Sequence, residues 1–515
     1  MAGESKNLAR AAEAAFERRG DYESLLFEGR WHRSGELFDQ AAAVATGLGQ
    51  LGLAPGERVA VSMRNCAEVG VIYQAVWRAG LVATPAMFLL APDDLRHVLA
   101  DSAARAVATT SEFLDKVRYA VAGLEPEPYV ICTDSATDSS TDSGTDGVVS
   151  LAELEAAPAG AIVPRADDDL AALLYTGGTT GQAKGVMLSH AALHYVGNAA
   201  YTSSHIEGVN RSLGTLPLSH AYGLLVTVSG FHAVERDVAV LLRWFDPDAF
   251  LGAIQEHRLQ QTAIVPSMLQ ALLAKPLEDY DLSTLVQVTS GASPLSPETE
   301  REFTRRVPSA SVRQGYGLTE SAALVASNPA GRARSGSVGL PVPGCEVEIR
   351  DPDDRSLPAG EAGEICVRSP GLMLGYWNAP ETTARAVRDG WLYTGDVGRL
   401  DEDGYLYIVD RIKDLIIRGG FNVYPRDVED ALVEHPAVAM AGVVGAPSAS
   451  HGEEVVAFVS LREGATLEPE QLIDWSRERI GGYKYPRQIN VVDAIPLTPV
   501  GKVDRKALRA QLTPS

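Results

Sequence analysis

Cysteine and long apolar runs are both scarce in this 515-residue sequence. The four cysteines lie far apart and form no CxxC pair, which excludes a disulfide framework and a common zinc site; they are Cys66, Cys132, Cys345 and Cys366. No stretch of about 18 apolar residues occurs, so no transmembrane helix is predicted. The first ten residues, MAGESKNLAR, contain no apolar segment typical of a signal peptide. We therefore expect a cytoplasmic protein.

Positive charge is also in short supply. The sequence contains 45 lysines and arginines and 67 aspartates and glutamates, so the formal net charge is −22. A field of that sign repels nucleic acid and anionic membrane surfaces, so neither is expected as a partner. It also repels ATP, and any nucleotide site must therefore supply its own local positive groups.

Two common catalytic motifs are missing as well. No GK[ST] follows a glycine-rich loop, which excludes a Walker-type phosphate loop. No GxSxG is present, which excludes an α/β-hydrolase nucleophile elbow.

The hydrophobic content is 45%, and the length is too great for one compact core, so at least two domains are expected. Short apolar runs alternate with amphipathic segments such as the predicted helix 67–78. This rhythm predicts α/β architecture with parallel sheets covered by helices. The predicted strands are 57–63, 81–86, 170–175, 213–218, 239–242 and 262–266.

The amino-acid composition and the pattern of apolar residues change twice along the chain. Residues 134–147 have almost no apolar character and predict a mobile loop. After about residue 340, short alternating runs predict a small β-rich subdomain. We expect a large N-terminal domain, 1–410, and a small mobile α+β domain, 411–515. The second domain is predicted to contain a hairpin in LIIRGGFNVY, helices at 425–434 and 468–480, and strands at 438–444, 454–461 and 488–493.

A glycine- and threonine-rich loop, YTGGTTGQAKG at 175–185, directly follows a predicted buried strand. Glycine lets several backbone N–H groups point at one anion, while threonine hydroxyls and a lysine add donors and charge. The loop therefore predicts a phosphate site. Its candidate ligands are Thr176, Gly177, Gly178, Thr179, Thr180, Gly181 and Lys184.

This loop resembles the phosphate loop of the adenylate-forming superfamily, which includes acyl-CoA synthetases, peptide-synthetase adenylation domains and luciferases. The family form is YTSGTTGxPKG; here Gly177 replaces the usual serine and Ala183 the usual proline. The loop loses one hydroxyl donor and becomes looser. Further motifs follow in the family's order over nearly the whole chain.

The resemblance implies a pocket for the acid and a site for the nucleotide. In LPLSHAYG (216–223), His220 would gate the acid pocket; TSGASPL (289–295) and QGYGLTES (314–321) would hold adenine. The implied acid pocket is His220, Ala221, Tyr222, Gly223, Pro266, Ser290, Gly291 and Leu318. The implied nucleotide ligands in these segments are Gly291, Ala292, Ser293, Gly315, Tyr316, Gly317 and Thr319.

The resemblance also implies roles for charged residues. Glu320 would hold Mg²⁺, since a hard cation that bridges phosphates needs one or two carboxylates. Asp396, at the end of WLYTGD, would bind both ribose hydroxyls, and Arg411 the ribose or phosphate side.

The last motifs imply moving parts. Lys413 in DRIKD would be the hinge, Gly419 and Gly420 would give the thiol access, and Lys502 would be the adenylation lysine. The implied catalytic set is Lys502, His220, Thr180 and Glu320.

The predicted function is ATP-dependent activation of an acid to acyl-AMP with release of pyrophosphate, followed by transfer to coenzyme A. The predicted pocket segments contain no lysine or arginine, so a monocarboxylate with a fatty or aromatic body is expected. Transfer to the thiol of an acyl carrier protein, to an amine or to another nucleophile stays open, as does a monomer or a homodimer.

Two further readings are disfavoured. Residues 221–230 contain no acid to bind an ammonium, which argues against amino-acid activation. The presence of Glu320, Asp396 and Lys502 argues against a binding protein that has lost catalysis.

Overall fold

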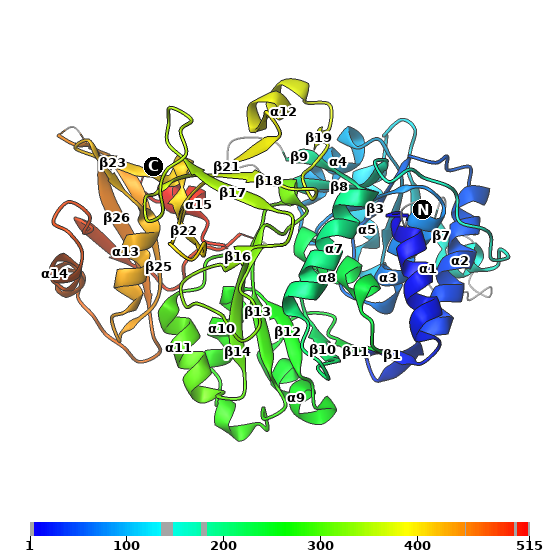
Figure 1. Ribbon diagram of the computed structural model, residues 1–515, viewed down its shortest axis with the longest axis horizontal. Helices are drawn as coiled ribbons and strands as arrows, with labels where there is room; N and C mark the ends of the chain where they lie inside the picture. Colours follow the sequence, from blue (N-terminus) through cyan, green and yellow to red (C-terminus); the bar gives the residue numbers. More distant parts are fainter. Residues whose placement is uncertain (1–4, 135–147, 177–182, 449, 499–501, 513–515) are drawn as a thin grey trace.

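The computed structural model describes residues 5–134, 148–176, 183–448, 450–498 and 502–512. Two large sheets and the helices around them make up most of these residues (Figure 1). A third, small sheet follows along the chain, and a fourth lies at the C-terminal end, to the left in Figure 1.

The first sheet is largely parallel and ends in an antiparallel edge. Its strands, in spatial order, are β19 (Gly375–Tyr376), β9 (Lys184–Ser189), β8 (Leu170–Thr176), β4 (Val82–Pro85), β3 (Arg58–Val61), β5 (Ala104–Thr109), β6 (Tyr129–Cys132) and β7 (Val148–Ser150).

The second sheet has a parallel centre with antiparallel pairs at both ends. Its strands, in spatial order, are β16 (Leu340–Pro341), β15 (Ala326–Ser327), β14 (Ser311–Tyr316), β13 (Gln287–Ser290), β12 (Gln261–Ile264), β10 (Arg211–Gly214), β11 (Val238–Leu241), β1 (Glu23–Phe27) and β2 (Arg30–Arg33).

The two smaller sheets are mainly antiparallel. The third contains β17 (Glu346–Arg350), β18 (Gly363–Arg368), β21 (Trp391–Leu400), β20 (Val387–Arg388) and β22 (Leu406–Arg411). The fourth contains β24 (Phe421–Val423), β23 (Ile416–Arg418), β26 (Gly452–Leu461), β25 (Val438–Ser448) and β27 (Gln488–Val491).

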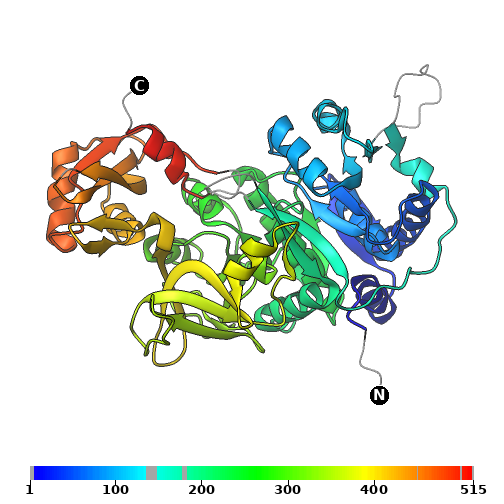
Figure 2. The ribbon, with the colours of Figure 1, turned by 90° about the horizontal axis from the view of Figure 1, so that it is seen from above.

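Helices cover the sheets (Figure 2). Up to Ser229 they are α1 (Leu8–Arg19), α2 (Ser34–Gln50), α3 (Ala67–Arg78), α4 (Pro92–Asp101), α5 (Leu114–Val121), α6 (Leu151–Glu155), α7 (His190–Ser204) and α8 (Ala221–Ser229). Those that follow are α9 (Pro247–His257), α10 (Pro266–Leu273), α11 (Pro297–Arg306), α12 (Pro380–Ala386), α13 (Pro425–Val433), α14 (Pro469–Arg479) and α15 (Arg505–Ala510).

Alternation along the strands decides which core each side chain joins. In β3, Val59 and Val61 face the central core with α3 and α7, whereas Ala60 faces a separate core with α4 and α5. In the second sheet, Val288 and Val312 face the core with α9, α10 and α11. The residues that alternate with them along the strands, such as Gln287, Thr289 and Arg313, point to the opposite face. Part of that face is available to form a site.

Most of the predicted elements are confirmed. The helix predicted at 67–78 is α3, and the hairpin, helices and strands predicted after residue 411 are β23 to β27, α13 and α14. The strand predicted at 213–218 was wrong in its bounds: β10 ends at Gly214. Pro217 has no N–H for a ladder, and its carbonyl accepts the His220 N–H in a turn.

Two expectations stay open here. The loop 134–147 lies, from residue 135 on, outside the described residues, and the domain boundary at residues 410 and 411 stays a prediction. Among the described residues, no helix is long and apolar enough to cross a membrane.

Two glycines of α2 give a matched test of packing. A Cβ on Gly47 would lie 2.6 Å from the Leu154 carbonyl oxygen of α6, whereas a Cβ on Gly49 meets nothing within 4 Å. We expect Gly47→Ala to lower the melting temperature, because overpacking typically costs about 1–3 kcal/mol. Gly49→Ala should leave it unchanged or raise it, since alanine favours a helix over glycine by up to about 1 kcal/mol. Equal effects in thermal melting would contradict this packing.

Candidate active site

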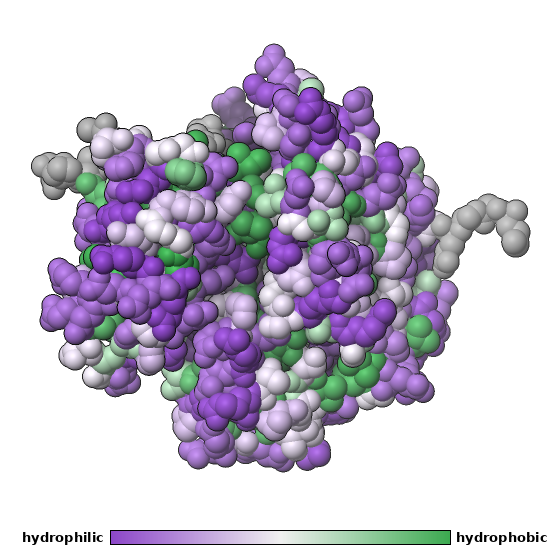
Figure 3. Space-filling model, turned by 60° about the vertical axis from the view of Figure 1, so that its left-hand side comes forward, coloured by the Kyte–Doolittle hydropathy of each residue, from purple (hydrophilic) through white to green (hydrophobic). Residues whose placement is uncertain are grey.

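A cavity of about 1540 Å³ lies between the second sheet, α8 and the C-terminal region, defined here as residues 411–515. Its wall includes residues from α7, α8, β13, β14, β21 and the loop before α15, which are far apart in sequence. Figure 3 shows a hollow near the centre of one face, with hydrophobic side chains visible between polar rims.

Most of the residues predicted for the site line this one cavity. They are Thr176, His220, Ala221, Tyr222, Gly223, Pro266, Gly291, Ala292, Ser293, Gly315, Tyr316, Gly317, Leu318, Thr319, Glu320, Asp396, Arg411, Lys413 and Lys502. Lys184, Ser290, Gly419 and Gly420 are described but are not part of its wall. Gly177, Gly178, Thr179, Thr180 and Gly181 lie outside the described residues, so most of the predicted phosphate loop stays untested.

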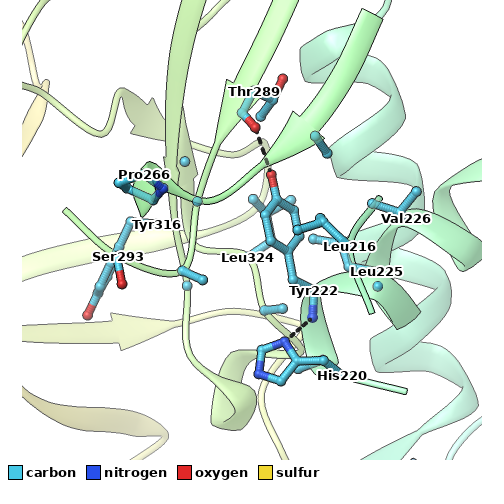
Figure 4. Close-up of a pocket in the computed structure, with 18 of the residues that line it drawn as sticks. Leu216, His220, Tyr222, Leu225, Val226, Pro266, Thr289, Ser293, Tyr316 and Leu324 are labelled. Carbon is cyan, nitrogen blue, oxygen red and sulfur yellow. Dashed lines mark hydrogen bonds between the residues drawn. The ribbon is translucent and has the colours of Figure 1, made fainter. Parts of the chain in front are cut away.

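The acid side of the cavity is built around α8. His220 precedes this helix, and its Nδ1 accepts the backbone N–H of Tyr222 at 3.3 Å (Figure 4). The Tyr222 hydroxyl donates to the Thr289 carbonyl at 3.3 Å. A Cβ on Gly291 would lie only 3.0 Å from the Tyr222 ring, so glycine is needed for the ring to sit against β13. The wall around the ring is apolar, with Leu216, Leu225, Val226 and Leu324.

Asp396 is a buried carboxylate of the cavity wall with a side-chain partner on each oxygen. It is 5% exposed and lies in β21 beside Arg411 of β22, with which it is in register. Its Oδ1 is 3.0 Å from Arg411 Nε, and its Oδ2 accepts the Tyr316 hydroxyl at 2.7 Å. A nearby pair of ribose hydroxyls would meet an oriented carboxylate here.

Lys502 places an ammonium group in the same cavity. Burial, and then the positive charge of Arg411, lower the pKa of Lys502 to about 8, while Asp396 and Glu320 oppose that shift. Burial and the neighbouring Lys502 lower the pKa of His220 to about 4, so this imidazole is neutral at neutral pH. The Lys502 carbonyl accepts the backbone N–H of Thr498 at 2.7 Å.

Glu320 lies in a 3₁₀ turn, η4 (Thr319–Ser321), immediately after β14. Its Oε1 accepts the hydroxyl of Tyr376 at 2.8 Å. Lys184, at the start of β9, lies 5.7 Å from the centre of the Tyr376 ring. The carboxylate thus faces the cavity with a lysine one ring away, an arrangement that suits a phosphate chain and its cation.

The predicted hinge and hairpin lie at the junction with the C-terminal region. Lys413 is in the 3₁₀ turn η5 (Ile412–Asp414), and burial and Arg411 lower its pKa. Gly419 and Gly420 form the turn between β23 and β24 with φ of +58° and +84°. The neighbouring Phe421 is 59% exposed, so in this structure the hairpin faces outward while Lys502 occupies the cavity.

Sequence reasoning missed two polar side chains at the site. Tyr376 belongs to the two-residue strand β19, which pairs with β9 from much earlier in the chain. Arg313 is buried in β14 beside the cavity wall. No strand was predicted over β14 (Ser311–Tyr316), so sequence reasoning assigned Arg313 no place, and a two-residue strand such as β19 gives no periodic signal.

The comparisons with known proteins agree with this geometry. The family model described as AMP-binding enzyme matches residues 12–377, and the AMP-binding enzyme C-terminal domain matches residues 427–502. A long-chain-fatty-acid–CoA ligase of Bacillus subtilis (strain 168) is 34% identical, covering 96% of this chain and 92% of the relative. A feruloyl-CoA synthase of an Amycolatopsis species is also 34% identical, covering 92% of both chains.

Solved structures agree as well. The crystal structure of ATP-bound MatB from Rhodopseudomonas palustris superposes with a TM-score of 0.88 and 32% identity, over 99% of both chains. The chain belongs to the AMP-binding enzyme family. Within it, the protein is an AMP-forming acid–thiol ligase that uses ATP and coenzyme A as substrates.

The bonds of Asp396 predict its effect on nucleotide binding. We expect Asp396→Asn to raise the Kd for ATP by about 10- to 100-fold, because hydrogen bonds to a charged group contribute roughly 1.5–3 kcal/mol. Asp401→Asn is the control, since Asp401 pairs with Arg334 and is not part of the cavity wall. Calorimetry with ATP checks both variants, and melting curves check their folding. An unchanged Kd for Asp396→Asn would rule out the ribose contact.

The lowered pKa of Lys502 predicts that the rate of acyl-AMP formation falls on the alkaline side of its pH profile. Lys502 carries its charge below about pH 8 and loses it as the pH rises through that value. The kcat/KM for acyl-AMP formation, which reports the free enzyme, should therefore fall above about pH 8. Lys502→Arg should be slower but show no such fall, because arginine stays protonated. A fall with the same midpoint in Lys502→Arg would assign the titration to another group.

Proposed function

We propose that this cavity adenylates a monocarboxylic acid, fatty or aromatic, and then passes the acyl group to the thiol of coenzyme A. The observation that carries the proposal is the placement of Lys502 in one cavity with Asp396, Glu320 and His220. The Lys502 ammonium is close enough to Asp396 and Glu320 for each to affect its pKa. The sequence around Lys502 does not by itself place this lysine beside Asp396, Glu320 and His220. The fold brings these residues together.

In the first step, the acid's carboxylate oxygen attacks the α-phosphorus of ATP, and the bond to pyrophosphate breaks. Lys502 would bridge the attacking carboxylate and the α-phosphate and neutralise the charge that develops there. Asp396 would hold the ribose, with Arg411 beside it, and Tyr316 would lie against the adenine. Positioning and charge neutralisation lower the barrier without a protein nucleophile.

Glu320 would hold Mg²⁺ at the phosphates. Its carboxylate accepts one bond from Tyr376 and faces the cavity, so the oxygen chemistry fits a hard cation. When bound, the ion supplies charge neutralisation for the leaving pyrophosphate. Lys184 and the hydroxyls of Thr176, Thr179 and Thr180 would bind the remaining phosphate oxygens.

The second step needs a different arrangement of the C-terminal region. Lys502 occupies the cavity while the Gly419–Gly420 turn lies outside its wall. We infer a rotation at Lys413 that withdraws Lys502 and brings this turn inward, because large rotations are absorbed at a few backbone positions. The thiolate then attacks the acyl carbon, and AMP leaves.

The nature of the acid follows from the wall of the pocket. Leu216, Leu225, Val226 and Leu324 surround Tyr222 and suit an apolar chain or ring (Figure 4). His220 is neutral at neutral pH and would not provide a cation for a second carboxylate. The relatives named for long-chain fatty acids and for ferulate act on acids of these two kinds.

The half-reactions test the proposal. We expect Lys502→Ala to slow acyl-AMP formation, measured as acid-dependent pyrophosphate release, by about two to three orders of magnitude. Formation of the thioester from preformed acyl-AMP and coenzyme A should stay within about threefold of the parent, because Lys502 is withdrawn in that step.

Lys506→Ala is the matched control. Lys506 also lines the cavity, four residues further on in α15. It should leave both half-reactions nearly unchanged. Equal losses in both half-reactions for Lys502→Ala would refute the division of roles, and a parent enzyme that releases no pyrophosphate with any fatty or aromatic acid would refute the function itself.

A further inference from the structure

The cavity wall formed by the second sheet changes character along its strands. The residues of this sheet that face the cavity are Ser212, Gly214, Ala239, Leu241, Gln261, Ala263, Gln287, Thr289 and Gly315. Near Gly291 and Gly315 the wall is made of small residues, whereas Gln261 and Gln287 lie at the opposite ends of their strands. The end of the cavity remote from the nucleotide is therefore polar.

Arg313 lies behind this polar end. It is in register with Thr289, on the same face of the sheet as Gln287, and its side chain is 1% exposed. Its Nη1 donates to Gln287 Oε1 at 2.7 Å and its Nη2 donates to the Ser203 carbonyl at 2.6 Å. Its Nε donates to the Asn328 carbonyl at 2.7 Å. Gln287, Ser203 and Ser327, which also contacts Nη2, all line the cavity.

The charge of Arg313 is not balanced by an acid. Among the residues that the structure describes, no carboxylate forms an ion pair with its guanidinium, and its partners are carbonyls, a hydroxyl and an amide. Burial lowers its pKa to about 10, so it still carries its charge at neutral pH. Burial raises the pKa of the nearby Tyr222, whose hydroxyl therefore stays neutral and cannot supply the missing negative charge. Buried charges are normally paired with an opposite charge, so Arg313 gives the site a positive potential that its neutral hydrogen-bond acceptors do not cancel.

Gln287 transmits this potential to the cavity. Its Oε1 is committed to Arg313, which fixes the amide so that Nε2 is a donor; Nε2 bonds to the Ser204 carbonyl at 3.2 Å. An amide nitrogen has two N–H groups, so one donor remains for a ligand. The inner end of the cavity thus offers one hydrogen-bond donor, on Gln287, that is polarised by a fixed cation.

The distance along the sheet sets the length of a ligand that reaches this end. Strands rise about 3.3 Å per residue, so Arg313 lies about 7 Å from Gly315, and Gln287 about 13 Å from Gly291. Both glycines lie where the carboxylate meets the nucleotide in the proposed function.

We propose that Gln287 and Arg313 form a specificity subsite for an oxygen acceptor, such as a carbonyl, ether or hydroxyl oxygen, at the remote end of the acid. The inference rests on the proposed function, since it takes the acid's carboxylate to lie near Gly291. The acid would carry this oxygen about 7–13 Å from its carboxylate. A purely hydrocarbon end would leave the polarised donor without a partner, which is costly in a buried site.

Two pairs of matched acids test the subsite. The aliphatic pair is 7-oxooctanoate and 7-methyloctanoate, and the aromatic pair is 4-methoxycinnamate and 4-ethylcinnamate. Each pair differs only by an oxygen in place of a carbon group of similar size. The enzyme is expected to accept at least one of these pairs as substrates, which is called the activated pair. Within that pair, the kcat/KM for pyrophosphate release should be about 10-fold or more higher for the oxygen-bearing acid, mainly because its KM is lower.

Gln287→Glu is the decisive variant. It keeps the shape, gives Arg313 a carboxylate partner and removes the donor that faces the cavity. We expect the preference to fall below about threefold, mainly through a higher KM for the oxygen-bearing acid. Gln261→Glu places the same charge on the same wall, one strand away from Gln287. It should retain most of the preference. Melting curves confirm that both variants fold.

The outcomes separate the subsite from the function. Equal kcat/KM values within the activated pair, a preference for the hydrocarbon acid, or a preference that survives Gln287→Glu would each overturn the subsite and leave the adenylation function standing. Activation of other fatty or aromatic acids, with neither pair accepted, would also overturn the subsite. No pyrophosphate release with any of these acids would overturn the adenylation function and the subsite together.

Discussion

The buried carboxylate of Asp396 is the interaction on which the rest of the site depends. The chain carries a net charge of −22, yet the nucleotide side of the cavity gathers Arg411, Lys413 and Lys502. Like charges brought this close lower one another's pKa, as they do for Lys413 and Lys502. Asp396 opposes that effect and orients Arg411 and Tyr316 through its two oxygens. Asp396 thus acts with Asp414 and Glu320 to stabilise the cations of this pocket.

The second sheet explains how one cavity can be both apolar and polar. One face of its strands packs against α9, α10 and α11 and is fixed by that core. The other face packs only in part against the central core, through residues such as Phe27 and Leu241, and elsewhere lines the cavity. Small residues near the nucleotide admit the substrate, and Gln287 and Arg313 lie deeper. Because alternate side chains of each strand point to opposite faces, the same strands supply a rigid support on one face and a cavity wall of changing polarity on the other.

Much of the fold could be predicted from the sequence, because its elements have strong periodicity. The helix α3 and the strands β3, β4 and β8 of the first sheet fall where apolar runs end at turn residues. The site was harder to predict. His220, Tyr316, Glu320 and Asp396 could be named from motifs, but the bond between Tyr316 and Asp396 joins strands 80 residues apart. Arg313 was overlooked because no strand was predicted over β14, and a buried arginine is understood only through its partners.

The packing around Lys502 ties this lysine to the same framework as the glycine hairpin. Lys502 lies three residues before Arg505, whose guanidinium bonds to Glu429 of α13 at 2.7 Å. The hairpin with Gly419 and Gly420 is joined to the same sheet through Arg418, which pairs with Glu454 of β26. Lys502 and the hairpin are therefore fixed to one framework from different sides. Under the proposed function, the withdrawal of the lysine and the arrival of the hairpin must be a single rotation, and an acyl-AMP would be exposed to the thiol only after the group that stabilised its formation has left.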